Sequence, residues 1–363
     1  MFLPMVPTRT AIGKPYKDEQ EKHLCRKDHC PFTNQGAFLI PADSLPGQAA
    51  GCAGPGSTQL LYEKKLILKN TTGLLILLDT CYCYTSNKFF KVIRINTYCK
   101  GSSIMKFEQI IIETGENHVA TLTLNRPESM NTFSSQMAFE LNQALIDLDS
   151  DPSVRVILLK GAGKAFCAGI DVTELAGKTA MEYREWIGKM EQPLVTISKL
   201  KKPVIAQLHG VAAANGMGLV AAADLVIAAD NSRMGLTAIN VGLNCVGPVI
   251  PVARCVGRKK ALELLFYGKL IKAPEALSLG LINKIVPKQD LESQALQWAE
   301  ELAKKSPIAL QIAKTAFYHS EDMNYEAQFA YMNEAFARLC TTDDAKEGVN
   351  AFFEKRNPVW QEK

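Results

Sequence analysis

Residues 161–171 read GAGKAFCAGID and residues 209–218 read HGVAAANGMG, and these two Gly-containing turns decide the fold. Each turn follows a stretch that predicts a buried strand, 154–159 before the first and 204–208 before the second. A strand that enters a helix through such a turn leaves the first helical amides unpaired at the positive end of the dipole. Two such turns facing one another would form an oxyanion hole, which binds an oxygen that gains negative charge.

Two nucleotide-binding patterns compete with this interpretation. The start of the first turn, GAGK at 161–164, echoes a phosphate loop but lacks its full spacing and the Ser or Thr after the Lys. The stretch GMGLVA at 216–221 fits the GxGxxA form of the dinucleotide fingerprint and opens a helix after a strand. No acidic residue ends a following strand about 20 residues further on, so a dinucleotide-binding oxidoreductase is the weaker alternative.

Strands and helices alternate around the two turns from residue 105 onward. Residues 119–124 alternate like a half-buried strand, and 135–149 place apolar residues at helical spacing. A helix of small residues is expected over 214–223, followed by a strand over 225–229 and by amphipathic helices at 291–304, 307–318 and 325–338. The pattern predicts an α/β core followed by a helical C-terminal region.

The first 104 residues differ from the rest in charge, Cys content and periodicity. They hold 13 of the 41 Lys and Arg, 7 of the 37 Asp and Glu, and six of the ten Cys. Their apolar runs are short and isolated, so we predict that 1–104 is a disordered or non-native extension upstream of an initiator at Met105. No metal site is predicted there, because no four-ligand zinc spacing includes His23, Cys25, His29 and Cys30.

The composition bounds the class of protein. A net charge of +4 with 47% hydrophobic residues is typical of a globular protein with a core and disfavours a nucleic-acid binder. No apolar run approaches the roughly 20 residues of a membrane-spanning helix, so no membrane partner is expected. The scarcity of Cys after residue 105 favours a reduced, intracellular domain, and we predict a cytoplasmic protein.

Several motifs carry a resemblance to a known family. They are NRPESMN at 125–131, GAGKAFCAGID at 161–171, KPVIA at 202–206 leading to HG at 209–210, ADLVIA at 223–228, ALSLGLINKIVP at 276–287 and FFEKRNP at 352–358. Their order and spacing resemble the enoyl-CoA hydratase/isomerase (crotonase) superfamily from residue 105 to the C-terminus. The resemblance implies a crotonase-like β-spiral of repeated ββα units over 105–300 and a helical trimerisation region over 301–363, assembled as a homotrimer or a dimer of trimers.

The resemblance also implies an acyl-CoA thioester as substrate, with coenzyme A as part of the substrate and no separate cofactor or metal. By position, the two oxyanion-hole amides fall on Ala168 and Asn215, where they would bind the thioester carbonyl and stabilise an enolate. The expected substrate-binding positions are Arg126, Lys164, Ala165, Phe166, Gly169, Ile170, Asp171, Lys355 and Arg356. The cations among them would pair with the phosphates of CoA.

The chain departs from the family pattern at the proton-transfer positions. The two glutamates of the hydratases fall on Gly218 and Ala238, and the acid of one isomerase branch falls on Val246, none of which can transfer a proton. This double loss resembles the enoyl-CoA-hydratase-domain-containing branch of the superfamily. We therefore expect a lyase or isomerase of fatty acid metabolism whose hydratase activity is weak.

Three explanations of the double loss stay open. Another group could transfer the proton, and Cys245 is the titrating candidate beside Asn215, Asn240 and Asn244. Alternatively, enolate stabilisation alone could suffice for an acyl-CoA decarboxylase. In the third explanation the protein is a non-catalytic acyl-CoA-binding or assembly subunit.

Overall fold

The computed structural model describes residues 38–41, 59–69, 75–85, 88–98 and 107–363, with side chains described from residue 107 onward. The chain divides into two units, Met1–Met105 and Lys106–Lys363. This division falls within one residue of the boundary expected between residues 104 and 105.

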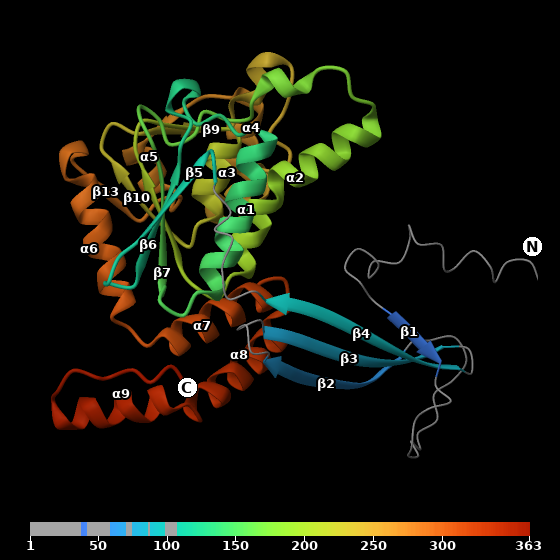
Figure 1. The fold of residues 1–363 in the computed structure, drawn as a ribbon. Coiled ribbons are helices and arrows are strands. Elements are labelled where there is room, and N and C mark those ends of the chain that lie inside the picture. Colours follow the sequence, from blue (N-terminus) through green and yellow to red (C-terminus); the bar gives the residue numbers. More distant parts are fainter. Residues whose placement is uncertain (1–37, 42–58, 70–74, 86–87, 99–106) are drawn as a thin grey trace, which may run out of the picture. The chain divides into compact units, whose positions relative to one another are not determined.

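The first unit contains an antiparallel sheet with the strand order β1-β4-β3-β2 (Figure 1). Its strands are β1 (Phe38–Pro41), β2 (Gln59–Lys69), β3 (Leu75–Thr85) and β4 (Lys88–Tyr98). The pairings are antiparallel throughout this sheet, and the assignment of residues 1–104 as a disordered or non-native upstream extension stays a prediction. Apolar runs that look isolated along the sequence pair through their backbones, which hydrophobic periodicity does not reveal. Initiation at Met105 stays a prediction.

The second unit begins with strands and continues with helices, as the sequence predicts. Its strands are β5 (Ile110–Thr114), β6 (Val119–Leu124), β7 (Val156–Gly161), β8 (Val204–Leu208), β9 (Val211–Ala213), β10 (Leu225–Ala229), β11 (Arg233–Gly235), β12 (Ile271–Lys272) and β13 (Lys284–Val286). Its helices are α1 (Ser135–Ser150), α2 (Ala180–Lys199), α3 (Asn215–Ala222), α4 (Val249–Tyr267), α5 (Ala273–Ser278), α6 (Leu291–Ala303), α7 (Pro307–Ser320), α8 (Tyr325–Cys340) and α9 (Asp343–Glu354). The boundary expected between residues 300 and 301 falls inside α6, which is a correction to the predicted domain limits.

Consecutive strands of the second unit go to two different sheets. One sheet has the order β13-β10-β8-β7-β6-β5 and the other has the order β12-β11-β9. Strands β8 and β9 lead into α3, and β10 and β11 lead into α4. The isolated bridge Cys167↔Ala212 places the segment after β7 beside β9 in the same way. This arrangement confirms the predicted α/β class with repeated ββα units and C-terminal helices.

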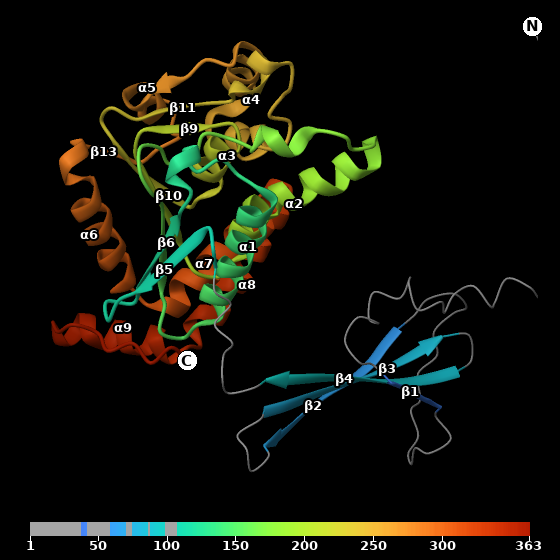
Figure 2. The same ribbon diagram turned by 45° about the horizontal axis from the view of Figure 1, so that its top comes forward.

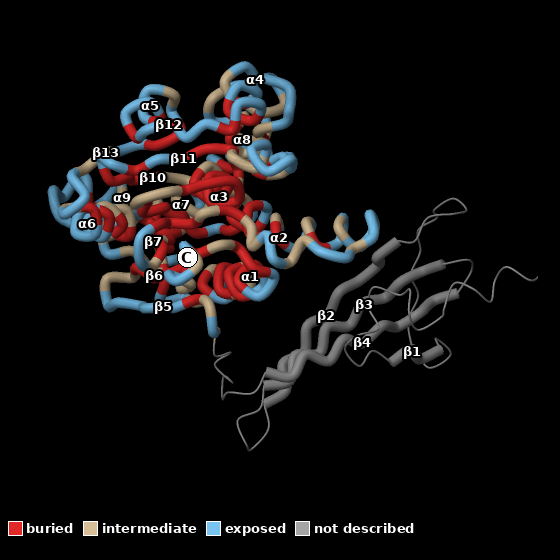
Figure 3. The backbone as a smooth tube through the Cα atoms, turned by 90° about the horizontal axis from the view of Figure 1, so that it is seen from above, coloured by how far each residue is buried: buried red, intermediate tan, exposed pale blue. Residues whose placement is uncertain are grey.

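The larger sheet separates two apolar layers, with α6 on one side and α1 on the other (Figure 2). On β7, Ile157 and Leu159 belong to the layer of α1 and α2, whereas Val156 and Leu158 belong to the layer of α6. Burial on both faces explains why this strand reads as a continuous apolar run. Figure 3 shows α3 buried within the first layer, which holds its N-terminus in place.

Within the described part of the chain, no helix combines the length and the apolar character that crossing a bilayer requires.

Candidate active site

The turns 161–171 and 209–218 lie against one another through backbone hydrogen bonds. The Cys167 N–H donates to Val211 O at 3.2 Å, and the Ala213 N–H donates to Cys167 O at 2.9 Å. These bonds extend the smaller sheet across both turns. The two segments singled out in the sequence are therefore neighbours in the fold.

Two glycines permit this close approach. A Cβ built on Gly216 would overlap Cys167 O, and a Cβ built on Gly210 would overlap Lys164 O. Gly210 also has a φ of +62°, which favours glycine. Any side chain at either position would push the two turns apart.

The second turn presents unpaired amides at the start of α3. The residue before the helix, Ala214, has φ 50° and ψ −113°, a conformation that L residues rarely adopt. The Gly218 N–H donates to Ala214 O at 3.0 Å and is the first amide of the helix with a partner. Among the described residues, no acceptor is bonded to the N–H groups of Asn215, Gly216 and Met217.

The first turn presents one unpaired amide, but not at the predicted residue. The Ala168 N–H donates to Met130 O at 3.0 Å, so the prediction that Ala168 supplies a free donor is wrong. Gly169, with φ +111°, then reverses the chain, and its carbonyl accepts from the Phe133 N–H at 2.7 Å. The following N–H, that of Ile170, has no acceptor within the described residues.

The two turns are in contact at Gly169 and Ala214, and each of these residues is followed by one with a free N–H. A Cβ built on Gly169 would lie 3.2 Å from Ala214 Cβ. Ile170 follows Gly169, and Asn215 follows Ala214. The Asn215 side chain is also buried, and its Nδ2 is an unsatisfied donor among the described residues. Several donors without acceptors among the described residues therefore lie where the turns meet, which makes this place the candidate ligand site.

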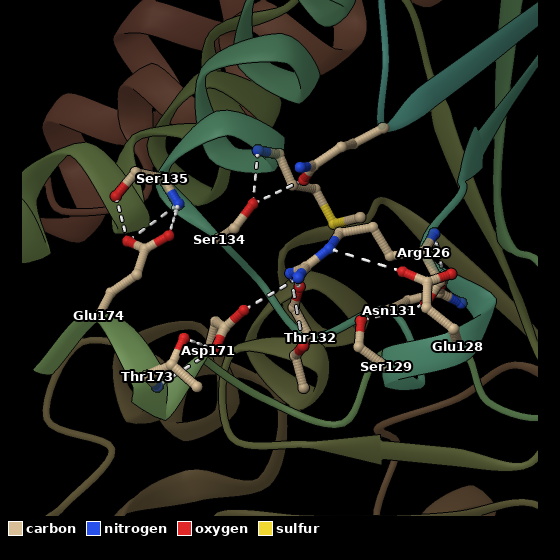
Figure 4. Close-up of polar contacts among 12 residues, drawn as sticks. Arg126, Glu128, Ser129, Asn131, Thr132, Ser134, Ser135, Asp171, Thr173 and Glu174 are labelled. Atoms are coloured by element: carbon tan, nitrogen blue, oxygen red, sulfur yellow. Dashed lines mark hydrogen bonds and ion pairs between the residues drawn. The ribbon is translucent and has the colours of Figure 1, made fainter.

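Arg126 holds the outer edge of the first turn (Figure 4). Its Nη1 donates to Thr132 O at 2.7 Å, and its Nη2 donates to Asp171 Oδ2 at 3.0 Å. The hydroxyl of Thr173 donates to Asp171 Oδ1 at 2.7 Å. The Thr173 hydrogen bonds and the Arg126 guanidinium hold the pKa of Asp171 below its usual range. Arg126 and Asp171 thus stabilise the turn, and contact of either with CoA stays a prediction.

Asn131 joins the first turn to the loop that carries Arg126, a role that the sequence did not indicate. Its side chain is fully buried, and its Nδ2 donates to Ala162 O and Ala165 O, each at 2.8 Å. Its Oδ1 accepts from the Arg126 N–H at 2.8 Å. Its φ of 55° suits Asn, which tolerates the left-handed region better than most residues. The preference of Asn for left-handed backbone conformation is the one sequence signal that could have indicated the role of Asn131.

The remaining predicted binding residues of the first turn differ in exposure. Ala165 and Phe166 are 2% and 0% exposed, so a substrate could reach only their main chains. Lys164 is exposed and forms no ion pair within the described part of the protein.

Lys355 and Arg356 lie at the C-terminal end of α9 and are far in sequence from the two turns. Lys355 caps the helix with φ 55°. Arg356 pairs with Glu347 at 2.6 Å and with Glu354 at 2.5 Å, and it lowers the pKa of Glu347 to about 2. Arg356 is therefore engaged within its own chain, and a contact with CoA stays a prediction for both cations.

The positions expected for family glutamates are filled by apolar neighbours. A Cβ built on Gly218 would lie 2.8 Å from Leu194 Cδ2 and 3.0 Å from Pro248 Cβ. Ala238 lies on the 3₁₀ helix η5 (Thr237–Val241) and packs against the core. A larger side chain at Gly218 would therefore require Leu194 or Pro248 to move.

The polar residues near these positions are used within the fold. Asn240 Nδ2 donates to Gly268 O at 3.0 Å, and Asn244 Oδ1 accepts from the Cys245 N–H at 2.8 Å. Burial raises the pKa of the Cys245 thiol, so this thiol is a poor acid–base group at neutral pH. His209 Nε2 lies 3.1 Å from Gly163 O, and burial lowers its pKa. A structural role at a strand end agrees with these contacts.

Asp224 is likewise engaged. Its Oδ2 accepts from the Val204 N–H at 2.7 Å and pairs with Lys314 Nζ at 2.6 Å. Its Oδ1 accepts from the Tyr318 hydroxyl at 3.0 Å. Asp224 therefore connects β8 to α7 and has no oxygen free of protein partners.

No group of three or more His, Cys, Asp or Glu within the described ranges could hold a metal ion. The cluster formed by His23, Cys25, His29 and Cys30 lies outside those ranges.

Residues 114–363 match the model of the family described as enoyl-CoA hydratase/isomerase. The chain is similar to a Thauera aromatica protein named (E)-benzylidenesuccinyl-CoA hydratase, with 34% identity over 68% of this chain and 96% of that protein. It is also similar to enoyl-CoA hydratase domain-containing protein 3, mitochondrial, of Xenopus laevis, with 31% identity over 72% of this chain and 90% of that protein.

The fold is similar to the crystal structure of an enoyl-CoA hydratase from Mycobacterium smegmatis. The TM-score is 0.68 with 36% sequence identity, and the match covers 69% of this chain and 98% of the other. The family match over residues 114–363 includes both Gly-containing turns and the C-terminal helices.

Proposed function

The chain belongs to the enoyl-CoA hydratase/isomerase family, and we propose that it binds an acyl-CoA thioester through main-chain hydrogen bonds to the thioester carbonyl. The donors are the N–H groups of Ile170 and Asn215. The observation that supports this proposal is the pair of neighbouring turns, each with an N–H that has no acceptor among the residues that the structure describes. Ile170 takes the place that the sequence assigned to Ala168.

These donors act on an oxygen that becomes negatively charged during the reaction. When the α carbon loses a proton, the carbonyl oxygen becomes an enolate oxygen. Both donors bind that oxygen more strongly than they bind the neutral carbonyl, which lowers the barrier, and Asn215 adds the favourable dipole at the N-terminus of α3. Loss of one such donor typically costs about 3 to 4 kcal/mol of transition-state stabilisation. The unsatisfied Asn215 Nδ2 supplies a further donor beside the pair.

Hydration is slow in this proposal, because the side that should activate water is apolar. Gly218 and Ala238 carry no proton, and Leu194 and Pro248 fill the space beside Gly218. The chemistry that remains is the formation of an enolate and its return to a thioester.

Assembly into a homotrimer or a dimer of trimers is part of the proposal. Large apolar side chains are exposed on the C-terminal helices and on α4, including Phe317, Phe329, Phe336, Phe352, Phe353 and Phe266. Exposed apolar surface of this kind is typical of a subunit interface. A cytoplasmic location stays a prediction, whereas the Xenopus laevis relative is named as mitochondrial.

Calorimetric titration with butyryl-CoA and infrared difference spectra of its ¹³C-labelled carbonyl would test the proposal. We expect saturable binding of one acyl-CoA per subunit and a shift of the carbonyl stretch to lower frequency, because the two N–H groups polarise the bond. Loss of the crotonyl-CoA double bond, followed by absorbance, should be slow. Binding without any shift of the carbonyl stretch would contradict the assignment of the two donors.

A further inference from the structure

The free N–H of Ile170 is oriented by one backbone contact with Phe133. The two residues form an isolated parallel bridge. The Phe133 N–H donates to Gly169 O at 2.7 Å, and the Asp171 N–H donates to Phe133 O at 2.9 Å. Because successive N–H groups along an extended segment point to opposite sides, the Ile170 N–H points away from Phe133. The direction of this donor therefore depends on how firmly the bridge is held.

The carboxylate of Glu174 makes a second connection between the same two segments. Glu174 lies on the 3₁₀ helix η4 (Val172–Leu175), which begins where the first turn ends. Its oxygens accept the Ser135 N–H at 3.0 and 3.2 Å, and Oε2 also accepts the Ser135 hydroxyl (Figure 4). Ser135 is the first residue of α1 and comes two residues after Phe133. The bridge and the carboxylate thus join the two segments at both ends.

Glu174 also connects the first turn to α2. On that helix, Trp186 is 9% exposed, and its Nε1 donates to Glu174 Oε2 at 3.0 Å and lies 3.0 Å from Ser135 Oγ. Lys178 Nζ donates to the main-chain oxygen of Glu174 and lies 5.6 Å from the centre of the Trp186 ring. A carboxylate that receives donors from two helices is fixed more firmly than one in an isolated surface ion pair.

The donors around Glu174 favour its ionised form. Burial raises the pKa of Glu174, but the hydrogen bonds from Ser135 and Trp186 outweigh burial and hold the pKa below its usual range. The negative charge also suits the positive end of the α1 dipole, where Ser135 lies. The carboxylate is therefore an acceptor for these groups at neutral pH.

We propose that Glu174 is a positioning residue for the oxyanion donor Ile170. Its carboxylate holds η4 against the start of α1, which fixes the bridge to Phe133 and so the direction of the Ile170 N–H toward the thioester oxygen. Without the carboxylate, only the bridge and the Arg126–Asp171 pair hold this end of the turn. A hydrogen bond weakens as its angle departs from linearity, so a donor that moves polarises the carbonyl less. The inference rests on the proposed function, because the donor acts only on a bound thioester.

A simple capping role at α1 leads to a different expectation. Ser134 Oγ already accepts the Met137 N–H at 3.0 Å as the N-cap of this helix, and Glu174 would only add a second acceptor. Loss of a cap lowers the stability of the protein but leaves the carbonyl of a bound ligand unchanged in the molecules that stay folded. The carbonyl stretch therefore separates positioning from capping.

Infrared difference spectra of butyryl-CoA with a ¹³C-labelled carbonyl test the proposal, at a temperature where every variant is folded. We expect Glu174→Ala to lose about half of the wild-type shift of the carbonyl stretch, because one of two donors is misdirected. Its calorimetric Kd for butyryl-CoA should stay within about threefold of the wild-type value, since the neutral carbonyl gains less from the donors than the enolate does.

Exchange of the α hydrogens of butyryl-CoA for deuterium in D₂O, followed by mass spectrometry, reports on the enolate. We expect this exchange to fall by about 10- to 100-fold in Glu174→Ala. Glu174→Gln keeps an acceptor for the Ser135 N–H, so its carbonyl shift and its exchange rate should lie between those of the wild type and Glu174→Ala.

Glu182→Ala is the matched control. Glu182 Oε2 accepts the N–H and the hydroxyl of Thr179, each at 2.7 Å, which are the same two kinds of donor that Ser135 offers to Glu174. These bonds form the capping box of α2 and do not reach the segment of Phe133. Glu182→Ala should therefore keep the wild-type carbonyl shift and exchange rate.

The two proposals fail in different ways. A carbonyl shift of the wild-type size in both Glu174 variants would overturn the positioning role and leave acyl-CoA binding intact. Equal loss of the shift in Glu174→Ala and Glu182→Ala would also overturn it, because the effect would then come from weakened helix ends in general. Absence of butyryl-CoA binding, or of any carbonyl shift, in the wild type would overturn the proposed function, and the role of Glu174 with it.

Discussion

The two sides of the candidate site use different parts of the polypeptide. On the donor side, the N–H groups of Ile170 and Asn215 belong to the main chain, and their placement depends on turns that pack without space for a side chain at Gly216. On the proton-transfer side, the chemistry needs a particular side chain, and the expected positions hold Gly218 and Ala238. Main-chain N–H donors are kept in any substitution that preserves the conformation of the turn. A proton-transferring side chain is lost in a single substitution, and only a side chain from another element can replace it.

The donor side should therefore be intolerant of added volume. Substitution Gly216→Ala places a Cβ in overlap with Cys167 O and at 2.9 Å from Cys167 Cβ. The turns must separate, which moves the α3 amides away from Ile170. We expect α-proton exchange on butyryl-CoA to fall by about 100- to 1,000-fold, the loss associated with one oxyanion donor.

Gly188→Ala is the matched control for this prediction. Gly188 lies on an exposed part of α2, and a Cβ built there meets nothing within 4 Å. Ala is favoured over Gly within a helix, so stability should rise slightly and exchange should not change. Wild-type exchange in Gly216→Ala would show that the donor side tolerates separation of the turns, and the contrast between the two sides would disappear.

The carboxylate of Asp224 sharpens the comparison, because it belongs to the same α3–β10 segment as the donor Asn215 but serves the fold. Asp224→Asn leaves Lys314, whose side chain is 7% exposed, without its counter-ion. We expect urea unfolding to show a loss of about 3 kcal/mol in the free energy of unfolding. The rate of α-proton exchange per folded molecule should stay within about twofold of the wild-type rate.

The control for Asp224→Asn is Asp230→Asn at the end of the same β10 segment, where the carboxylate is exposed. Its stability should stay within about 0.5 kcal/mol of the wild type. A large loss of exchange in Asp224→Asn without loss of stability would give Asp224 a chemical role.

Much of the second unit could be predicted because its signals are local. The continuous apolar run of β7 and the helical spacing of Met137, Leu141 and Leu145 in α1 follow from burial on one or two faces. The sheet of the first unit could not be predicted in the same way, because strand pairing depends on residues far apart in the sequence. For example, Leu75 pairs with Tyr98.

The site was predictable only as far as the turns. The sequence places both Gly-containing turns together, but whether a given amide is free depends on a partner elsewhere, and Met130 O takes the Ala168 N–H.

Glu191 on α2 is a half-buried carboxylate whose Oε1 has no hydrogen-bond partner within the described residues, and its substitution by Gln should affect stability. Burial raises the pKa of Glu191 in the folded state, so the folded protein binds a proton more readily than the unfolded chain does. The carboxyl group therefore favours folding least above its folded-state pKa, and stability is lost as the pH rises through that value. Glu191→Gln should raise the melting temperature by about 1 to 3 °C at neutral pH and have little effect in acid.

Equal melting temperatures for the wild type and Glu191→Gln across the pH range would mean that the carboxylate is well solvated. The inference that burial raises the pKa of this carboxyl group would then fail.

Lys164 tests whether the donor side also recognises the nucleotide part of the substrate, with the smallest expected effect. Its side chain is exposed on the first turn, four residues before Ala168, whose N–H donates to Met130 O. Within the described part of the chain, Lys164 forms no ion pair. We expect Lys164→Gln to raise the calorimetric Kd for butyryl-CoA about threefold at low salt, because one screened contact with a phosphate is lost. The difference should vanish at high ionic strength.

Butyryl-pantetheine, which lacks the phosphates, separates this contact from a disturbance of the turn. Its affinity should be the same for the wild type and Lys164→Gln, and the exposed Lys189→Gln on α2 should change neither affinity. Equal weakening of both ligands by Lys164→Gln would mean that the side chain supports the turn itself. The donor side would then also depend on a side chain. The two sides would differ only in how strongly they depend on side chains.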